Sequence, residues 1–302
     1  MDYLWGIDLG GTKIEGVVLD SRDLSKVICR KRVATEASKG YDHILSVIKD
    51  LIVSISNETG LKPEKIGYGT PGTIDSLTQQ LKNSNTVCLI GKPLKDDLKK
   101  ITDAEVVLAN DANCFALAET HMGIVKDKMP NAEVVFGIIM GTGVGGGIVV
   151  NGKVINGRHG IAGEWGHNFL DESGGVCYCG RSGCVETIIS GPALEKYYFL
   201  LSGKNLSLKD IVRKAEDNQD DNAIKTMNRL TQFFGKAMAP IINIIDPDVV
   251  VLGGGVGNVE TLYSSGVLEI KKYLFNNAFD TLFLKPKLGD SAGVFGAAAL
   301  VL

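Results

Sequence analysis

The stretch LWGIDLGGTKIEGVVLD, residues 4–20, decides the fold class of this chain. An apolar run stops at Gly10 and Gly11 and a second apolar run follows, which is the pattern of two strands joined by a glycine turn. The pattern returns in VVFGIIMGTGVGGGIVVNG, residues 134–152, where we expect Gly141, Gly143 and residues 145–147 to form the turn. An internal repeat of this kind predicts two related lobes.

The rest of the chain alternates short strands with helical periodicity. A third glycine turn, Gly253 to Gly255 with Gly257, follows the apolar strand 248–252. Further strands are predicted at 65–68 and 106–108, and helices at 41–59, 110–121, 194–201, 207–216, 223–245 and 291–302. This alternation is typical of the α/β class.

Glycine turns suit anion binding, because backbone N–H groups approach a phosphate closely only where no Cβ intervenes. Thr12, Lys13 and Thr142 add side-chain donors. One glycine turn can equally be only a tight hairpin, but three in one chain favour phosphate binding. Asp8 is an acid in a predicted buried strand, so we expect it to face a Mg²⁺ ion bound to phosphate oxygens. Its alternative role is that of a turn-capping aspartate.

An acidic residue stands where a strand gives way to a helix in LANDANCFALAETHMG, residues 108–123. The free N–H groups and the dipole of the helix N-terminus stabilise an ionised Asp111, so we expect a low pKa and a group available as proton acceptor. The alternative is that Asn110 or Asp111 is simply the helix N-cap. The segment GYGTPGT, residues 67–73, is predicted to be a turn that either lines a substrate cleft or is purely structural.

Residues 163–186, GEWGHNFLDESGGVCYCGRSGCVE, combine cysteines, a histidine and glycines. Cys177, Cys179, Cys184 and His167 form a complete tetrahedral set of the kind that holds structural zinc. A redox pair or buried free thiols is the alternative. Positive φ angles are expected at the glycines that fold the loop, which are Gly174, Gly175, Gly180 and Gly183. Glu164 and Glu186 bracket the loop.

Composition excludes several classes of protein. The 302 residues suffice for two lobes with a sizeable core, and the formal net charge of −3 without a basic block argues against a nucleic-acid partner. Neither a signal-peptide pattern nor a membrane-length apolar run is present. The scattered cysteines Cys29, Cys88 and Cys114 indicate a reducing compartment, so we expect a cytoplasmic protein with a small-molecule partner and no membrane association.

The motifs together resemble a known family. DLGGTK at 8–13, NDAN at 110–113, GTGVGGG at 141–147, GEWGH at 163–167 and CYCGRSGCVE at 177–186 are similar to those of the ROK sugar kinases. The resemblance covers nearly the whole chain and implies the actin-like, ribonuclease H-like ATPase fold, with a nucleotide and sugar cleft between two lobes. We expect a small N-terminal lobe at 1–114, onto which the helix 291–302 packs, and a large lobe at 115–290 that carries the zinc loop.

The resemblance also implies roles for matching residues. Asp8 would hold Mg²⁺, and His167 would be shared between structural Zn²⁺ and the sugar. The residues implied to grip the ATP phosphates are Gly10, Gly11, Thr12, Lys13, Gly141, Thr142, Gly143 and Gly145, and those bordering the adenosine are Gly253, Gly254 and Gly255. The residues implied to bind the sugar hydroxyls are Asn110, Asp111, Glu164, His167 and Glu186, with Asp111 as the general base.

The implied activity is ATP-dependent phosphorylation of a hexose at its 6-hydroxyl. The combination AGEWGHN, CYCGRSGCVETIISG and NIIDPDVVVLGGG looks most like the bacterial fructokinase or mannofructokinase branch, so fructose is the first expectation. N-acetylglucosamine is the alternative, followed by N-acetylmannosamine, glucose or mannose. A sugar-sensing regulator of the same family is disfavoured, because the first strand begins too near Met1 for a preceding DNA-binding module. A homodimer is expected from the resemblance.

Overall fold

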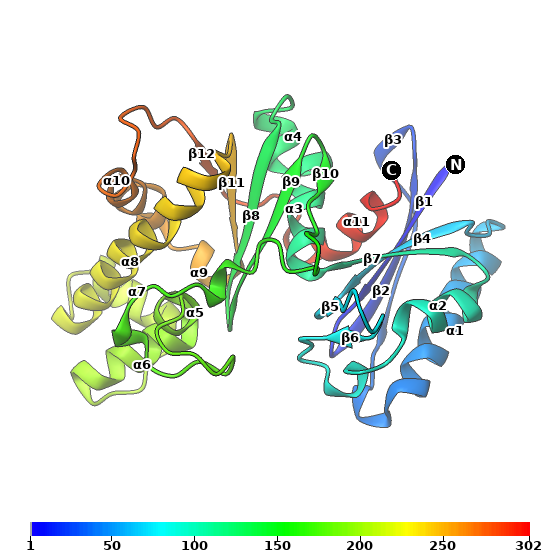
Figure 1. Cartoon of the computed structure of the whole chain (residues 1–302), viewed down its shortest axis with the longest axis horizontal. Helices are drawn as coiled ribbons and strands as arrows, with labels where there is room; N and C mark the ends of the chain where they lie inside the picture. The colour runs from blue at the N-terminus through cyan, green and yellow to red at the C-terminus, as the bar shows by residue number, and fades with distance from the viewer. Residues whose placement is uncertain (1) are drawn as a thin grey trace. The chain divides into compact units, whose positions relative to one another are not determined.

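The computed structural model describes residues 2–302 (Figure 1). The contacts of the chain divide it into two units. Unit 1 comprises Met1–Asn131, Gly147–Gly163 and Lys287–Leu302, and unit 2 comprises Ala132–Gly146 and Glu164–Pro286. The domain boundary predicted after residue 114 stays a prediction, and the contacts of unit 1 continue to Asn131.

Unit 1 is built on a five-stranded sheet with the order β3-β2-β1-β4-β7. Its strands are β1 (Tyr3–Leu9), β2 (Lys13–Asp20), β3 (Asp23–Ala34), β4 (Lys65–Thr70) and β7 (Glu105–Asn110). The first two form the predicted antiparallel hairpin, in which Asp8 pairs with Glu15. β4 runs parallel to β1, and β7 runs parallel to β4. The carboxyl ends of β1, β4 and β7 therefore point the same way, which is the edge where α/β sheets place ligands.

Successive side chains point to opposite faces of this sheet and pack in two separate hydrophobic cores. Trp5, Ile7 and Leu9 on β1 face the helices α1 (Tyr41–Thr59) and α2 (Leu94–Thr102). Leu4 on β1 and Val17 and Leu19 on β2 pack in a cluster with residues of α11 (Ala292–Ala299) instead. Asp8 has the parity of Leu4, so the pleat places its carboxylate on the face that α11 covers.

α11 approaches the sheet unusually closely because glycines line the contact. A Cβ atom at Gly6 would lie 2.4 Å from the backbone nitrogen of Ala298, and one at Gly67 would lie 1.8 Å from the Ala297 carbonyl oxygen. Both distances are far below van der Waals contact, so no larger residue fits either position. α11 also packs against α3 (Asp111–His121), which is followed by α4 (Ile124–Lys128).

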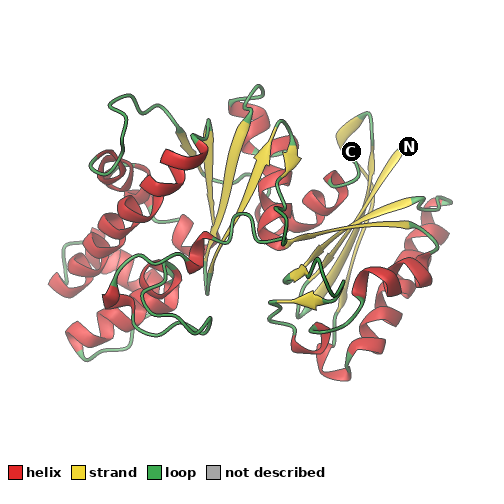
Figure 2. Cartoon of the chain, in the orientation of Figure 1, coloured by secondary structure: helices red, strands yellow, loops and turns green. Residues whose placement is uncertain are grey.

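Unit 2 combines parallel strands with a group of helices (Figure 2). β11 (Val249–Gly253) lies between β8 (Val134–Met140) and β12 (Leu282–Leu284), parallel to both. The long helix α8 (Asp221–Ile245) is central to the helical part. The helices that pack against it are α5 (Glu186–Ile189), α6 (Gly191–Ser202), α7 (Leu208–Glu216) and α10 (Ser265–Lys271). An edge-to-face contact of Phe234 with Phe283 joins α8 to the sheet.

The predicted repeat is present in the strand order. The second sheet has the order β10-β9-β8-β11-β12, in which β9 (Val144–Val150) and β10 (Lys153–Val154) are antiparallel. It matches the first sheet strand for strand, with β8 in the place of β1 and β11 in the place of β4. Each sheet therefore starts with a glycine hairpin and continues with parallel strands.

Three local predictions are wrong in detail. Residues 145–147 lie within β9 and the turn is limited to Gly141–Gly143, because β9 is hydrogen bonded from Val144 onward. Gly67–Thr70 continue β4, so only Pro71 and Gly72 of the predicted turn interrupt it before β5 (Thr73–Ile74), which pairs with β6 (Leu81–Lys82). The third glycine turn is the short helix α9 (Gly254–Gly257).

The described part of the chain, residues 2–302, holds no helix that is long and apolar enough to cross a membrane.

Candidate functional site

The acid predicted to face a metal ion lies near the carboxyl end of β1. Asp8 packs beneath α11, where a Cβ atom at Gly293 would lie 2.6 Å from Asp8 Oδ2. A Cβ atom at Gly69 on β4 would lie 3.2 Å from both Asp8 Oδ1 and the thiol of Cys114. Small residues around the carboxylate therefore leave room for it on the inner face of the sheet.

Burial, and then the negative charges of Asp111 and Glu15, raises the pKa of Asp8 to about 6. Glu15 itself is fully buried and compensated, since it accepts from Arg32 Nη2 at 2.7 Å and also pairs with Arg30. Among residues 2–302, the Asp8 carboxylate has no such ion pair, and the charges of Lys13 and Arg32 lower its pKa less than burial and the neighbouring acids raise it. Acids gathered in this way are a suitable environment for a divalent cation with oxygen ligands, so the residues fit the predicted Mg²⁺.

The first glycine turn is closed by its own backbone and by a threonine from β3's end. Gly10 donates its N–H to the Lys13 carbonyl oxygen at 3.0 Å. Thr35, which is fully buried, donates Oγ1–H to the Gly10 oxygen at 2.6 Å and N–H to the Thr12 oxygen at 3.0 Å. Thr35 is a supporting residue that the sequence patterns do not reveal, because only the fold brings it to the turn.

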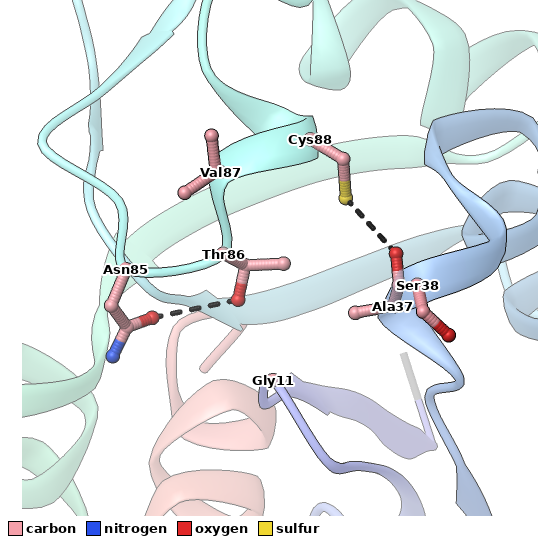
Figure 3. Close-up of a pocket in the computed structure, with 7 residues that line it drawn as sticks. All are labelled: Gly11, Ala37, Ser38, Asn85, Thr86, Val87 and Cys88. Atoms are coloured by element: carbon pink, nitrogen blue, oxygen red, sulfur yellow. Dashed lines mark hydrogen bonds between the residues drawn. The ribbon is translucent and has the colours of Figure 1, made fainter.

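A pocket of ≈ 510 Å³ lies beside this turn within unit 1 (Figure 3). Its lining residues are Gly11, Ala37, Ser38, Asn85, Thr86, Val87 and Cys88. Figure 3 shows Cys88 directed to the carbonyl of Ala37, with a sulfur–oxygen distance of 3.7 Å. No sequence pattern predicts this pocket. Its only signal is the polar run Ser84-Asn85-Thr86, which reads as an ordinary loop.

The sequence left open whether Asn110 or Asp111 is the N-cap of the helix, and the structure assigns the cap to Asn110. Asn110 is the N-cap of α3, since its side chain accepts from the Asn113 N–H at 2.8 Å. Asp111 is the first residue of the helix, and its Oδ1 accepts from the Ala112 N–H at 2.8 Å. The helix is therefore capped without Asp111, whose carboxylate is left for another role.

The low pKa predicted for Asp111 is wrong. The Asp111 side chain is in contact with solvent, but many protein atoms surround its carboxyl group and this burial raises its pKa. The backbone N–H groups of Ala112 and Asp111 lower the pKa by a smaller amount. A raised pKa moves the group toward the range in which a carboxylate is an effective general base near neutral pH.

In unit 2, the second glycine turn holds a carboxylate. Glu186 Oε2 accepts from the Val144 N–H at 2.9 Å, and a Cβ atom at Gly143 would lie 2.6 Å from the same oxygen. The start of α6 also contacts this turn, because Gly191 donates its N–H to the Gly141 oxygen at 2.9 Å. The sequence separates Glu186 from the turn, and the fold of unit 2 joins them.

The third glycine segment lies against the end of β8. Gly254 has a φ of +78°, and a Cβ atom there would lie 2.2 Å from the Met140 carbonyl oxygen. Gly253 ends β11 and Gly255 lies in α9, where a Cβ atom would meet nothing within 4 Å. Unit 2 thus brings the second and third glycine segments together at the carboxyl ends of two parallel strands.

The GEWGH segment is tied to the first residues of β9. Trp165 donates Nε1–H to the Gly145 oxygen at 3.1 Å and contacts Phe136 edge to face. A Cβ atom at Gly166 would lie 2.0 Å from the Val144 oxygen, so this position requires glycine. Glu164 directly precedes the 3₁₀ turn formed by Trp165–His167.

The four predicted zinc ligands converge. One ligand atom from each of His167, Cys177, Cys179 and Cys184 lies within 4.8 Å of all the others. The Cys177 Sγ–His167 Nδ1 and Cys179 Sγ–Cys184 Sγ distances are both 3.6 Å. Ligands about 2.3 Å from one ion lie about 3.7 Å apart in a tetrahedron, so this donor set fits zinc.

The glycines of this loop serve two purposes. Gly175, Gly180 and Gly183 have positive φ angles of 69°, 86° and 77°, as predicted. Gly174 does not, and the prediction is wrong there. Position 174 has no room for a larger side chain, since a Cβ atom there would lie 2.4 Å from Thr187 Oγ1.

Two sheets of matching strand order, each opening with a glycine hairpin, define the fold as the actin-like ATPase fold. More specifically, the chain belongs to the ROK family, whose model matches residues 4–302. The predicted family and fold are thus confirmed.

Individual relatives match over the whole length. The chain is 38% identical to the N-acetyl-D-glucosamine kinase of Histophilus somni (strain 129Pt), over 99% of this chain and 98% of the relative. The crystal structure of the ROK hexokinase from Thermus thermophilus superposes with a TM-score of 0.87 and 31% identity, covering 99% of this chain and 97% of that one. The ROK family glucokinase from Streptomyces griseus, in complex with glucose and AMPPNP, gives a TM-score of 0.75 at 27% identity, covering 99% and 98%.

Proposed function

We propose that this chain transfers the γ-phosphoryl group of ATP to the 6-hydroxyl of N-acetyl-D-glucosamine. The observation that carries the proposal is the match, across essentially the whole chain, to a relative named for that activity. The prediction of a sugar kinase as the enzyme class is confirmed. Fructose, which the sequence patterns placed first, is not supported, because curated relatives named N-acetyl-D-glucosamine kinase match the whole length at 38% and 35% identity.

Asp111 is the proposed general base. It is the first residue of α3, its carboxylate is not needed as the helix cap, and its pKa is raised. It would take the proton of the 6-hydroxyl while that oxygen forms a bond to the γ-phosphorus. The bond from the γ-phosphorus to the bridging oxygen breaks, and ADP leaves with the electron pair.

Asp8 is the proposed Mg²⁺ ligand. Magnesium, when bound, would neutralise charge on the phosphates of ATP. Asp8 lies near two other acids, and its pKa is raised to about 6. A cation bound at Asp8 would favour the ionised form of its carboxyl group.

The glycine segments are proposed to bind the nucleotide. Backbone N–H groups of the first two turns would donate to phosphate oxygens, as would the side chains of Thr12, Lys13 and Thr142. Gly253, Gly254 and Gly255 would border the adenosine, since they present only backbone and a Cβ atom at Gly255 would meet nothing within 4 Å.

The sugar hydroxyls are proposed to contact carboxylate and amide groups. Glu186 keeps its second oxygen free of the hydrogen bond to Val144, and Asn110 keeps its amide N–H groups, because only its oxygen caps α3. Glu164 and His167 are the remaining proposed contacts. Groups that read hydroxyls can reject a sugar lacking one of them strongly.

Zinc is proposed as a structural ion at His167 and the three cysteines. All four positions of a tetrahedral ion would be filled by the protein, so no place remains for a reacting water. The cluster would fix the loop that leads into Glu186 at the start of α5.

The test is turnover on a panel of sugars. Purified protein is assayed by coupled ADP release with N-acetyl-D-glucosamine, N-acetyl-D-mannosamine, fructose, mannose and glucose, and the product is identified by phosphorus NMR. We expect the highest kcat/KM with N-acetyl-D-glucosamine and phosphate on its 6-oxygen. A higher kcat/KM with any other sugar would overturn the substrate assignment, and no turnover on any would overturn the kinase proposal.

The expected homodimer and cytoplasmic location stay predictions. Light scattering coupled to size-exclusion chromatography measures the first directly.

A further inference from the structure

The third glycine segment, residues 253–257, has few contacts of its own to fix its backbone. α9 is only four residues long, three of these are glycines, and no side chain caps its N-terminus. A helix this short is not stable alone, and glycine loses more conformational freedom on ordering than any other residue. Buried Val256 anchors the middle of the segment, so its two ends depend on contacts from elsewhere in unit 2.

Tyr263 supplies such a contact to both ends. Its hydroxyl donates to the Gly257 carbonyl oxygen at 2.7 Å and lies 3.3 Å from the Leu252 carbonyl oxygen. Gly257 ends α9, and Leu252 directly precedes Gly253 at the end of β11. One hydroxyl reaches both carbonyls because the two ends meet: a Cβ atom at Gly257 would lie 2.6 Å from the same Leu252 oxygen. The last carbonyls of a helix have no partner within the helix, so Tyr263 satisfies one that α9 leaves open.

The Tyr263 side chain is itself fixed by its neighbours. It ends the 3₁₀ turn η5 (Glu260–Tyr263), in which Leu262 is fully buried. Lys285 Nζ lies 5.3 Å from the centroid of the Tyr263 ring and also pairs with Glu260. The hydroxyl is therefore held in position by packing on its ring, as a residue that orients another part of a site requires.

We propose that Tyr263 is a positioning residue for the nucleotide, whose hydroxyl holds residues 253–257 in the conformation that receives the adenosine. The inference rests on the proposed sugar-kinase function, in which Gly253, Gly254 and Gly255 border the adenosine. These glycines offer a ligand only their backbone, so the conformation of the backbone sets the shape of the surface that the adenosine meets. Without the hydroxyl the segment populates further conformations, and the apparent dissociation constant of the nucleotide rises as the competent fraction falls.

The test is Tyr263→Phe, which keeps the ring and removes the hydroxyl. Binding of ADP to the purified full chain is measured by isothermal titration calorimetry with Mg²⁺ and without sugar. We expect the dissociation constant to rise about 3- to 10-fold, as for the loss of one hydrogen bond. KM for ATP should rise by a similar factor, while KM for the sugar changes less than about twofold.

Tyr198→Phe is the matched control, because it also removes one tyrosine hydrogen bond from unit 2. Tyr198 is a fully buried residue of α6, and its hydroxyl donates to Oδ2 of Asp220, the N-cap of α8, at 2.7 Å. We expect both variants to lower the melting temperature. Only Tyr263→Phe should weaken ADP binding and accelerate amide hydrogen exchange in residues 253–257, which a merely structural role would not do.

The outcomes separate this proposal from the proposed function. If the dissociation constant of ADP in Tyr263→Phe equals that of the wild type or that of Tyr198→Phe, the role of Tyr263 is overturned and the kinase assignment stays intact. A wild type that binds neither ADP nor AMPPNP would overturn both.

Discussion

Replacing Gly143 by alanine should separate sugar binding from stability. The new Cβ atom would lie 2.6 Å from Glu186 Oε2, whereas ordinary contact begins at 3.4 Å, so one of the two must move by about 0.8 Å. Because Glu186 Oε2 is the far end of a flexible side chain, the carboxylate can move while the fold stays intact. That movement weakens its 2.9 Å hydrogen bond with the Val144 N–H.

The magnitude follows from the type of hydrogen bond that is disturbed. A hydrogen bond to a charged group contributes about 1.5–3 kcal/mol, and each 1.36 kcal/mol is about tenfold in rate. If the displaced Glu186 loses a bond of this kind to the sugar, kcat/KM for the sugar should fall about 10- to 150-fold. The melting temperature should change by no more than about 2 °C, since no backbone clash is created.

The assay compares Gly143→Ala with Gly141→Ala in the same turn. A Cβ atom at Gly141 would meet nothing within 4 Å, so this variant should leave KM for the sugar unchanged and raise only KM for ATP. Both constants are measured by coupled ADP release with the other substrate saturating. Wild-type kcat/KM for the sugar in Gly143→Ala would refute the placement of Glu186 against the turn.

Three further predictions follow from the acids and the cysteine cluster. Asp111→Asn should lower kcat by at least about 100-fold with sugar affinity changed less than about threefold, and near-normal turnover would exclude Asp111 as the base. The pKa of Asp8 is raised from 3.8 to about 6, so the folded state binds the Asp8 proton more tightly than the unfolded state does. Protonated Asp8 therefore stabilises the fold below about pH 4, and this stabilisation is lost as the pH rises through 6. In metal-free urea titrations, wild type should therefore lose up to roughly 3 kcal/mol relative to Asp8→Asn between pH 4 and 7, and equal pH dependence would contradict it. Cys179→Ser should lose zinc, thermal stability and sugar affinity, whereas Cys88→Ser, outside the cluster, should retain full zinc by elemental analysis; equal zinc in both would contradict the ligand set.

The features that could be predicted from the sequence are those encoded locally. Helix α1 begins and ends where its periodicity and the following Gly60 place it, at Tyr41 and Thr59. The β1–β2 hairpin follows from two apolar runs around one glycine turn. The four ligands of the cysteine loop lie within one short segment, so their meeting needed little knowledge of the fold.

The features that could not be predicted depend on contacts between distant segments. The Asp111 pKa is set by burial that a helix-terminus argument does not contain. Thr35 contacts the first glycine turn only because β3 runs antiparallel to β2. Position 143 has no room for a Cβ atom because the Glu186 carboxylate lies against it.

The way α11 closes unit 1 has a consequence for biosynthesis. The helix follows all of unit 2 in the chain, yet it supplies Val294 and Ala298 to the core that covers Leu4 and Val17. While a ribosome is still making unit 2, that face of the first sheet has no cover and its apolar strands are open to incorrect pairing. The first unit to emerge is thus among the last to be completed, and chaperone contact during translation should concentrate on the uncovered face of β1 and β2.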